Sequence, residues 1–278
     1  MTDTLKISEH FFSVQGEGHL STGVPAYFVR LTDCNLSCGA SQKQLNQVRK
    51  GNLVIHTNDQ WHGDLHENTE ASWTCDSIAV WLKGKEIAFE YLVSQWRNQL
   101  IYKDILSGLV HVIWTGGEPT LPKHQKDIVA FINWLQNESS YERNVFYNPY
   151  YEIETNGTIC LTHELFSKLQ QINCSPKLSN SGMSLQKRIV ANALESIMAH
   201  PRYQFKFVIS NESDIQEMFD TFIEPFKIPL NRVCCMPALD DREQYHKMSH
   251  FICEMAKKYK FIAQQRLHIS AWGAVTGV

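Results

Sequence analysis

Three cysteines, Cys34, Cys38 and Cys75, are the residues of this chain with the clearest capacity for metal chemistry. The first two stand in Cys34-Asn35-Leu36-Ser37-Cys38, where Asn and Ser favour a loop over buried packing. A closed structural zinc site needs a fourth donor, and an iron–sulfur cube normally has four cysteine ligands. Three thiolates instead favour a centre with one open position. At an iron–sulfur cube, that open iron could chelate S-adenosylmethionine.

A zinc site is the alternative, because His62 and His66 lie between Cys38 and Cys75. The spacing from Cys38 to His62 exceeds that of a standard zinc finger, and Cys75 would be left over. We expect both histidines to be polar surface residues.

Three of the other cysteines are expected to be packing residues only. We expect Cys160, Cys234 and Cys253 to be small buried side chains, as most cytoplasmic cysteines are.

A glycine pair follows an apolar run in Thr115-Gly116-Gly117-Glu118-Pro119. Consecutive glycines let backbone amides and carbonyls approach a ligand closely. Glu118 could accept a hydrogen bond from an ammonium group or could fix the turn. By itself, a Gly-Gly turn after a strand is a weak signal.

Charged residues also stand on the predicted strands. Arg30 could hold a carboxylate through two parallel hydrogen bonds, or it could pair only with a neighbouring acid. Glu154 fits either an active-site role or a structural one at a strand end. We interpret Lys206, which alternates with Phe205 and Phe207, as a solvated strand position.

Length and composition limit the class of protein. The 278 residues fit one large domain or two ordinary ones, and 43% are hydrophobic and 20% charged. A formal charge of −3 argues against a nucleic-acid clamp. We see neither a signal-peptide pattern nor an apolar run long enough for a membrane span. Eight cysteines without such a signal indicate a reducing compartment. We therefore expect a soluble cytoplasmic protein.

The elements that must position these residues alternate between strands and helices. The predicted strands cover 7–14, 25–31, 109–114, 151–154, 172–174, 205–209, 233–236 and 267–269. The predicted helices cover 89–100, 128–135, 162–171, 184–199 and 241–259, with another that begins after Asn211 as N-cap. This alternation predicts one α/β domain over residues 1–278 with a parallel sheet, and its chemistry at the carboxyl ends of the strands.

Residues 39–74 interrupt this pattern as a polar excursion without a strong helical period. The excursion holds one short strand-like piece at 53–56. We interpret it as a surface insertion within the loop that carries the three cysteines.

The order of the motifs resembles that of a known enzyme family. The cysteines followed by Gly-Gly-Glu-Pro resemble the radical S-adenosylmethionine superfamily, and the narrower similarity is to the 7-carboxy-7-deazaguanine synthases. This narrower similarity runs from about residue 7 to the C-terminus. The segments that carry it are 11–18, 28–31, 34–38, 75–77, 115–119, 154–157, 175–177, 236–237, 272–273 and 277–278.

The chain departs from the family pattern at two places. The family usually has its third cysteine three residues after the second, where this chain has Ser41. Here the third cysteine is Cys75, which lies 34 residues beyond that position. The family also commonly has Asp-Thr after that cysteine, with the hydroxyl on Mg²⁺. Here the pair is Asp76-Ser77, which retains the oxygen.

The resemblance implies a partial (βα) barrel and a radical lyase. This enzyme would convert 6-carboxy-5,6,7,8-tetrahydropterin into 7-carboxy-7-deazaguanine and ammonia, in queuosine-type biosynthesis. It implies a [4Fe-4S] cluster on Cys34, Cys38 and Cys75, S-adenosylmethionine as cofactor, and Mg²⁺ at Ser77. A flavodoxin-like reductant is expected, and a homodimer is possible.

The resemblance also assigns roles to single residues. Binding of S-adenosylmethionine is implied for Thr74, Cys75, Asp76, Gly116, Gly117, Glu118, Ser175 and Lys177. Substrate binding is implied for Val14, Gln15, Gly16, Glu17, Arg30 and Thr115. The predicted catalytic residues are Glu17, Arg30 and Glu154.

Two alternatives stay open at this point. A radical S-adenosylmethionine enzyme with another substrate would keep the cluster and use Gln15, Glu17 and Arg30 differently. A zinc-stabilised binding module would use the three cysteines and a histidine without catalysis.

Overall fold

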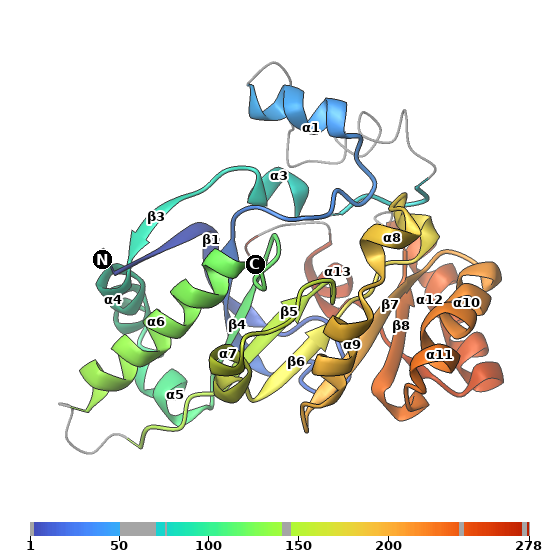
Figure 1. Cartoon of the computed structure of the whole chain (residues 1–278). Helices are drawn as coiled ribbons and strands as arrows, with labels where there is room; N and C mark the ends of the chain where they lie inside the picture. Colours follow the sequence, from blue (N-terminus) through green and yellow to red (C-terminus); the bar gives the residue numbers. More distant parts are fainter. Residues whose placement is uncertain are drawn as a thin grey trace.

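A single curved sheet organises the chain, with helices along its outer face (Figure 1). The computed structural model describes residues 3–50, 71–75, 77–140, 146–238, 242–273 and 277. The strands are β1 Thr4–Val14, β2 Pro25–Leu31, β3 Lys85–Ala88, β4 His111–Gly116, β5 Tyr151–Thr155, β6 Gln171–Cys174, β7 Tyr203–Ile209, β8 Val233–Pro237 and β9 Ile262–Ala263.

The α-helices are α1 Gln42–Arg49, α3 Ile78–Trp81, α4 Phe89–Asn98, α5 Tyr102–Ser107, α6 Pro122–Ser139, α7 His163–Lys168, α8 Leu185–Arg188, α9 Ala191–Met198, α10 Glu212–Met218, α11 Glu224–Phe226, α12 Arg242–Tyr259 and α13 Leu267–Trp272. Short helical turns are η1 Ser179–Ser181, η2 Phe219–Ile223 and η3 Leu230–Arg232.

The strand order in the described sheet is β3-β1-β2-β4-β5-β6-β7-β8-β9. All pairs from β2 to β9 are parallel, whereas β1 is antiparallel to both of its neighbours. The sheet stays open, since β3 and β9 stand at its two ends. The expected partial barrel of α/β class is therefore confirmed.

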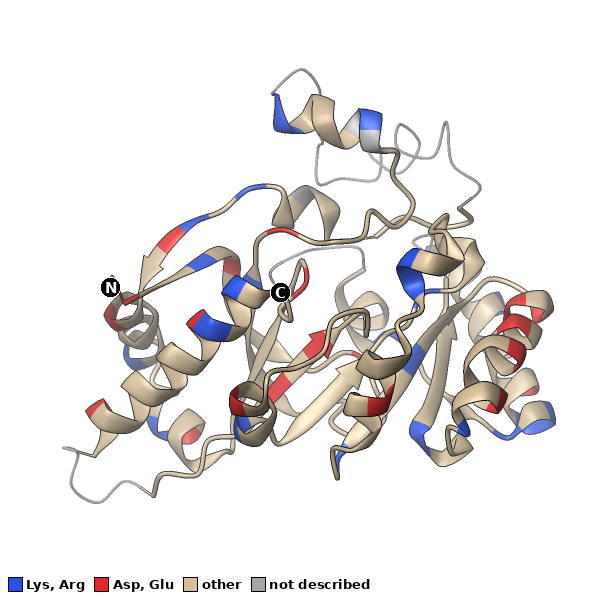
Figure 2. Ribbon diagram, viewed as in Figure 1, with Lys and Arg blue, Asp and Glu red and all other residues tan. Residues whose placement is uncertain are grey.

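Alternating side chains give the sheet two different faces. On β5, Tyr151 and Ile153 pack into the main apolar core, while Glu152 and Glu154 point to the inner, concave face. The same alternation on β7 sends Phe205 to the core and Lys206 inward. Figure 2 shows the acidic positions of β5 and the basic position of β7 in the interior of the molecule. The concave face is therefore polar and charged, which is unusual for a buried surface.

Aromatic side chains fix the helices against the outer face of the sheet. Phe131 of α6 makes edge contacts with Trp96 of α4, at 5.7 Å between ring centroids, and with Trp114 of β4, at 5.5 Å. All three side chains are fully buried. These contacts hold α4, α6 and β4 together, and β4 delivers the glycine pair.

Most predicted elements are present, and the differences include the following. Residues 267–269 are the start of helix α13, because three alternating residues are too few to separate the two periods. The predicted helix at 184–199 is broken into α8 and α9. Helix α1 lies in the excursion where no helix was expected, and the strand-like piece at 53–56 lies outside the described residues. Strand β3, with Ile87 its one buried side chain, was missed.

The direction of β1 corrects a further expectation. Since β1 is antiparallel to β2, Val14 pairs with Pro25 at the amino end of the parallel strands. The loop after Val14 therefore starts at the opposite edge from the other motifs. It reaches them by crossing the concave face, where Ser21 Oγ donates to Glu152 at 2.9 Å.

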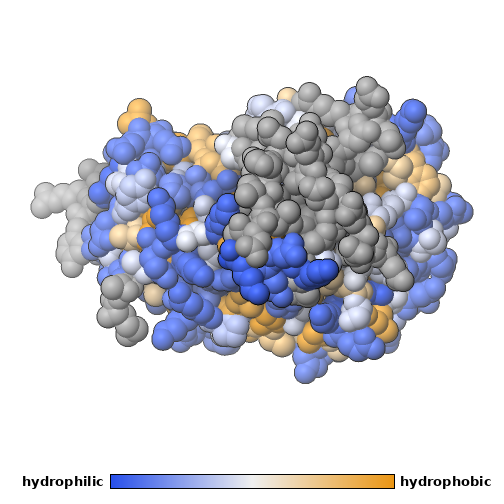
Figure 3. Space-filling view, turned by 90° about the horizontal axis from the view of Figure 1, so that it is seen from above, coloured by the Kyte–Doolittle hydropathy of each residue, from blue (hydrophilic) through white to orange (hydrophobic). Residues whose placement is uncertain are grey.

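No helix in the described ranges is both long and apolar enough to cross a membrane. Seen from the side of α1, the described surface is mainly hydrophilic, with separate small hydrophobic patches (Figure 3).

The glycine pair at the end of β4 lies against the backbone of β2. Gly117 N–H donates to the Leu31 carbonyl at 3.0 Å, and Glu118 N–H donates to the Asp33 carbonyl at 2.8 Å. A Cβ on Gly117 would lie 1.7 Å from the Asp33 oxygen. Close approach of two chain segments, rather than of a ligand alone, therefore explains this glycine.

We expect Gly117→Ala to lower the free energy of unfolding by at least about 3 kcal/mol, because two backbones must separate. Urea unfolding measures this. The matched control is Gly23→Ala, where a Cβ would meet no atom within 4 Å. That control should cost about 1 kcal/mol for its positive φ. Equal effects of the two substitutions would contradict the explanation.

Candidate active site

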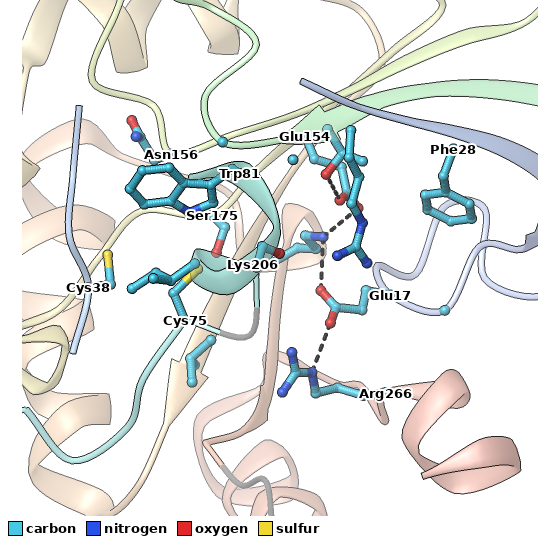
Figure 4. A pocket seen from close by; sticks show the side chains of 18 of the residues that line it. Glu17, Phe28, Cys38, Cys75, Trp81, Glu154, Asn156, Ser175, Lys206 and Arg266 are labelled. Atoms are coloured by element: carbon cyan, nitrogen blue, oxygen red, sulfur yellow. Dashed lines mark hydrogen bonds and ion pairs between the residues drawn. The ribbon is translucent and has the colours of Figure 1, made fainter. Parts of the chain in front are cut away.

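A cavity of about 210 Å³ lies on the concave face of the sheet. Every predicted site residue within the described ranges lines it, and Asp76 alone lies outside them. Figure 4 shows Cys38 and Cys75 on one side of the cavity and the charged residues Glu17, Lys206 and Arg266 on the other.

The two ends of the excursion meet beside the cysteines. Gly39 has φ +77°, and a Cβ on it would lie 2.3 Å from the Trp73 carbonyl oxygen and 2.4 Å from Thr74 Cα. Cys75 N–H donates to the Cys38 carbonyl at 3.1 Å. The chain thus leaves after Cys38 and returns to the same point, which places the late third cysteine next to the second.

The three cysteines lie at one side of the cavity, where they could share a metal centre. All three line the cavity, and the Leu36 amide lies 3.4 Å from Cys34 Sγ. Among the described residues, no group of three or more His, Cys, Asp or Glu is arranged to hold one metal ion. An iron–sulfur cube offers a separate iron to each thiolate, so its ligands need not converge on one point. His62 and His66, which the zinc alternative requires, lie outside the described residues.

Burial raises the pKa of the Cys34 and Cys38 thiols in the metal-free protein. Among the cysteines expected to be buried, Cys234 is buried. Cys160 and Cys253 are exposed, so that expectation was wrong for them.

Glu118 ties the ends of β4 and β5 together. Its Oε1 accepts from the Thr120 amide at 2.9 Å and from Thr155 Oγ1 at 2.8 Å, and its Oε2 accepts from the Asn156 amide at 2.8 Å. Burial raises the pKa of this carboxyl group, and these hydrogen bonds oppose the rise. Glu118 as a whole is 1% exposed. Glu118 therefore fixes the turn, which was one of its two predicted roles.

A chain of four alternating charges forms the other side of the cavity. Lys206 Nζ lies 3.0 Å from Glu154 Oε1 and 3.2 Å from Glu17 Oε2, and Glu17 Oε1 lies 2.8 Å from Arg266 Nε. Lys206 is 2% exposed, so its interpretation as a solvated position was wrong. Two carboxylates and two cations balance in this chain, as burial requires.

These charges set the protonation of Glu17 and Lys206. Burial alone would raise the pKa of Glu17, but Lys206 and Arg266 hold it well below the usual range. Burial would lower the pKa of Lys206, but Glu154 and Glu17 raise it above the usual value. Glu17 is therefore a carboxylate and Lys206 an ammonium group at neutral pH.

Glu154 also organises neighbouring polar groups. It accepts from Thr115 Oγ1 at 2.8 Å and from Gln15 Nε2 at 3.3 Å. Gln15 Oε1 in turn accepts from the Glu17 amide at 3.1 Å. The loop after β1 is thereby fixed over β4, β5 and β7, although it begins at the far edge of the sheet.

The guanidinium of Arg30 is paired with an acid through one nitrogen, and another of its nitrogens has no hydrogen-bond partner among the described residues. Its Nε lies 3.3 Å from Glu9 Oε1, and its guanidinium lies over the Phe11 ring at 5.4 Å. Its Nη1 is buried and has no hydrogen-bond partner among the described residues. Arg30 lines the cavity, so its guanidinium is placed to meet an acceptor on a ligand.

The remaining predicted residues line the wall nearer the cysteines. Lys177 Nζ donates to Ser175 Oγ at 3.0 Å and lies 5.6 Å from the centre of the Trp73 ring. Thr74 is buried, and Ser77 lies at the start of α3. Gly116 has φ +105°, and like Gly117 it packs closely against the backbone of β2.

Three charged or titratable residues of the cavity wall were not predicted, namely Lys206, Arg266 and His268. The alternation of Phe205, Lys206 and Phe207 was a usable signal, since it places Lys206 on the face opposite the apolar core. Arg266 and His268 gave no comparable signal. They reach the cavity through α13, whose Leu267 amide donates to the Gly16 carbonyl at 2.9 Å.

We expect Lys206→Met to lower the free energy of unfolding by about 3 kcal/mol at pH 7, because two partly buried carboxylates lose their shared cation. A depressed pKa means that Glu17 stabilises the fold above the ordinary carboxyl pKa, and that this contribution disappears as the pH falls through the lowered value. The loss in the variant should therefore shrink below about pH 4. Urea unfolding at several pH values tests both statements.

Lys123→Met is the matched control for this prediction. Lys123 also pairs with a glutamate, Glu86, at 3.3 Å, but both side chains are more than half exposed. The control should change stability by less than about 1 kcal/mol. A pH-independent loss in Lys206→Met would show that packing, not charge, is what Lys206 supplies.

Several known proteins that are similar to this chain share one name. No protein-family model matches this sequence. A 7-carboxy-7-deazaguanine synthase of Pyrobaculum aerophilum is 28% identical over 99% of this chain and 98% of its own. A synthase of the same name from Rhodopirellula baltica is 26% identical over 97% of this chain and 87% of its own. One from Halobacterium salinarum is 25% identical over 96% of this chain and 90% of its own.

A solved structure supports the same relationship at the level of fold. The crystal structure of QueE from Escherichia coli is similar with a TM-score of 0.55 and 20% sequence identity, covering 95% of each chain. At that identity the likeness shows a shared fold. Together with the sequence similarity over nearly the whole length, it makes the chain similar to the 7-carboxy-7-deazaguanine synthases in both sequence and fold.

Proposed function

We propose that this protein is a radical S-adenosylmethionine lyase that converts 6-carboxy-5,6,7,8-tetrahydropterin into 7-carboxy-7-deazaguanine and ammonia. One observation carries the proposal. The cysteines and the polar residues expected to meet a pterin, which are far apart in the sequence, line a single cavity. The similar synthases carry the name of this activity.

Cys34, Cys38 and Cys75 would hold the [4Fe-4S] cluster of the family. When bound, the cluster supplies the electron that cleaves S-adenosylmethionine and so starts radical chemistry. Thr74, Ser175, Lys177 and the backbone of Gly117 line the adjacent wall and are proposed to bind that cofactor.

The substrate would lie against the charged side of the cavity. The guanidinium of Arg30, which lines the cavity, is proposed as the donor for the carboxylate of the pterin. Glu17 is ionised, so it can accept hydrogen bonds from the amino group and ring N–H of a pterin, and the Gln15 amide can both donate and accept. Gly16 and Val14 would present backbone groups to the same edge.

Lys206 gives these acceptors a fixed charge and orientation. Because it contacts both Glu17 and Glu154, a carboxylate that turned away would leave the buried ammonium with only one of its two anionic partners. Glu154 also orients Thr115 and Gln15 toward the cavity. We propose Glu17, Arg30 and Glu154 as the residues that touch the reacting pterin. The enclosing walls would exclude water from the radical reaction.

The same proposal extends to the surroundings of the reaction. It includes Mg²⁺ on the Ser77 hydroxyl, which is an oxygen ligand of the kind Mg²⁺ prefers. It also includes a flavodoxin-like electron donor, a cytoplasmic location and a homodimer, with the product used in queuosine-type biosynthesis. The binding of Asp76 to the cofactor stays a prediction, since that residue lies outside the described ranges.

The activity is tested by anaerobic turnover. Protein reconstituted with iron and sulfide receives S-adenosylmethionine, Mg²⁺, a strong reductant and 6-carboxytetrahydropterin, and mass spectrometry follows 7-carboxy-7-deazaguanine and 5′-deoxyadenosine. We expect both products. Deoxyadenosine without the deazapurine would mean another substrate, and neither product from cluster-loaded protein would contradict the proposal.

The ligand role of Cys75 has its own test. We expect Cys75→Ala to lose most of the iron and sulfide bound after reconstitution, together with the visible absorption. Cys160→Ala should keep them, because Cys160 is exposed and does not line the cavity. Full iron and sulfide in Cys75→Ala would assign the third ligand to another residue.

A further inference from the structure

The closing end of the excursion is attached to the short helical turn η1. The Ser72 amide donates to the Asn180 carbonyl at 2.9 Å, and Trp73 Nε1 donates to Asn180 Oδ1 at 2.9 Å. At the opening end, the Gly39 amide donates to the Ser181 carbonyl, also at 2.9 Å. One turn of backbone thus receives both ends of a detour of more than thirty residues.

The turn η1 is itself fixed to the sheet and to α10. Asn180 Nδ2 donates to the Val208 carbonyl of β7 and to Asp214 Oδ2, each at 2.9 Å. Asp214 is 5% exposed, and its Oδ2 also accepts from the Ser210 amide at 2.6 Å. Asn180 is 7% exposed, and its side chain uses its carbonyl and its amide group for these three bonds.

The position of Cys75 depends on this attachment. Trp73 is two residues before Cys75, and Thr74 between them is 2% exposed. The entropic cost of closing a loop rises only slowly with its length. A long loop alone, however, does not determine where its end lies. Here the bonds from Ser72 and Trp73 to Asn180 fix that end, and they act together with the bond from the Cys75 amide to the Cys38 carbonyl.

We propose that Asn180 is a positioning residue for the third metal ligand, which holds the returning end of the excursion so that Cys75 faces the cavity. It acts through Trp73 and Ser72 and does not line the cavity itself. The part of this inference that concerns the cluster rests on the proposed function. The part that concerns the position of Cys75 does not.

The first test uses metal-free protein and needs no cluster. Alkylation by N-ethylmaleimide is followed at each cysteine by peptide mass spectrometry. In Asn180→Ala we expect Cys75 to react about tenfold faster, the factor for loss of one good hydrogen bond. Cys174, which is buried in the sheet, should stay unreactive at the wild-type level.

The second test measures iron and sulfide after reconstitution, and the electron paramagnetic resonance spectrum of the reduced protein. Asn180→Ala should bind less iron or give an altered spectrum. The matched control is Asn173→Ala, since Asn173 is also buried and its side chain also makes three hydrogen bonds, but it neither lines the cavity nor bonds to the ends of the excursion. That control should match wild type in Cys75 alkylation and in the spectrum.

Trp73→Phe provides a variant with a smaller change if Asn180→Ala does not fold. It removes only the indole donor and keeps an aromatic ring, so it should accelerate Cys75 alkylation in the same direction. Wild-type alkylation rates in folded Asn180→Ala and Trp73→Phe would overturn the inference, whatever the activity. Faster Cys75 alkylation with no cluster in wild-type protein would support the positioning and contradict the proposed function.

Discussion

A single buried ammonium group, that of Lys206, constrains how the inner side of this protein can be built. Burying it requires paired negative charge, and its two partners come from distant parts of the chain. Glu154 belongs to the middle of the sheet, whereas Glu17 belongs to the loop after β1 and also binds Arg266 next to α13. The N-terminal loop and the C-terminal helix are therefore held over the same strands, and together they enclose the charged side of the cavity.

The opposite side of the cavity depends on backbone rather than on charge. Gly39, Gly116 and Gly117 each lie where a Cβ would collide with neighbouring main chain. These contacts bring the ends of β2 and β4 and the two ends of the excursion to one place. The cavity thus has one wall fixed by ion pairs and another fixed by close backbone packing, which suits a polar substrate on one side and a metal cluster on the other.

Much of this arrangement could be predicted from the sequence, and the failures have physical causes. Alternation and helical period identified most strands and helices, and the family motifs identified the residues around the cavity. The direction of β1 was missed because a period of two is the same in parallel and antiparallel strands. Lys206 was misjudged because its burial depends on Glu17 and Glu154, which only the fold brings together. The short segment of α13 was ambiguous, and the return of the excursion to Cys38 left no pattern in the residues between.

The meeting of Gly39 with Thr74 has a consequence for how such an enzyme can vary. A detour that leaves and re-enters the fold at one point does not change the path of the chain on either side of it. Its length is then limited by closure entropy, which grows only logarithmically with the number of residues. Different lengths of chain between the second and third cysteines can thus be accommodated without rebuilding the substrate side of the cavity. The spacing of a cysteine motif along the sequence is, in this fold, a poor guide to the spacing of its thiols in space.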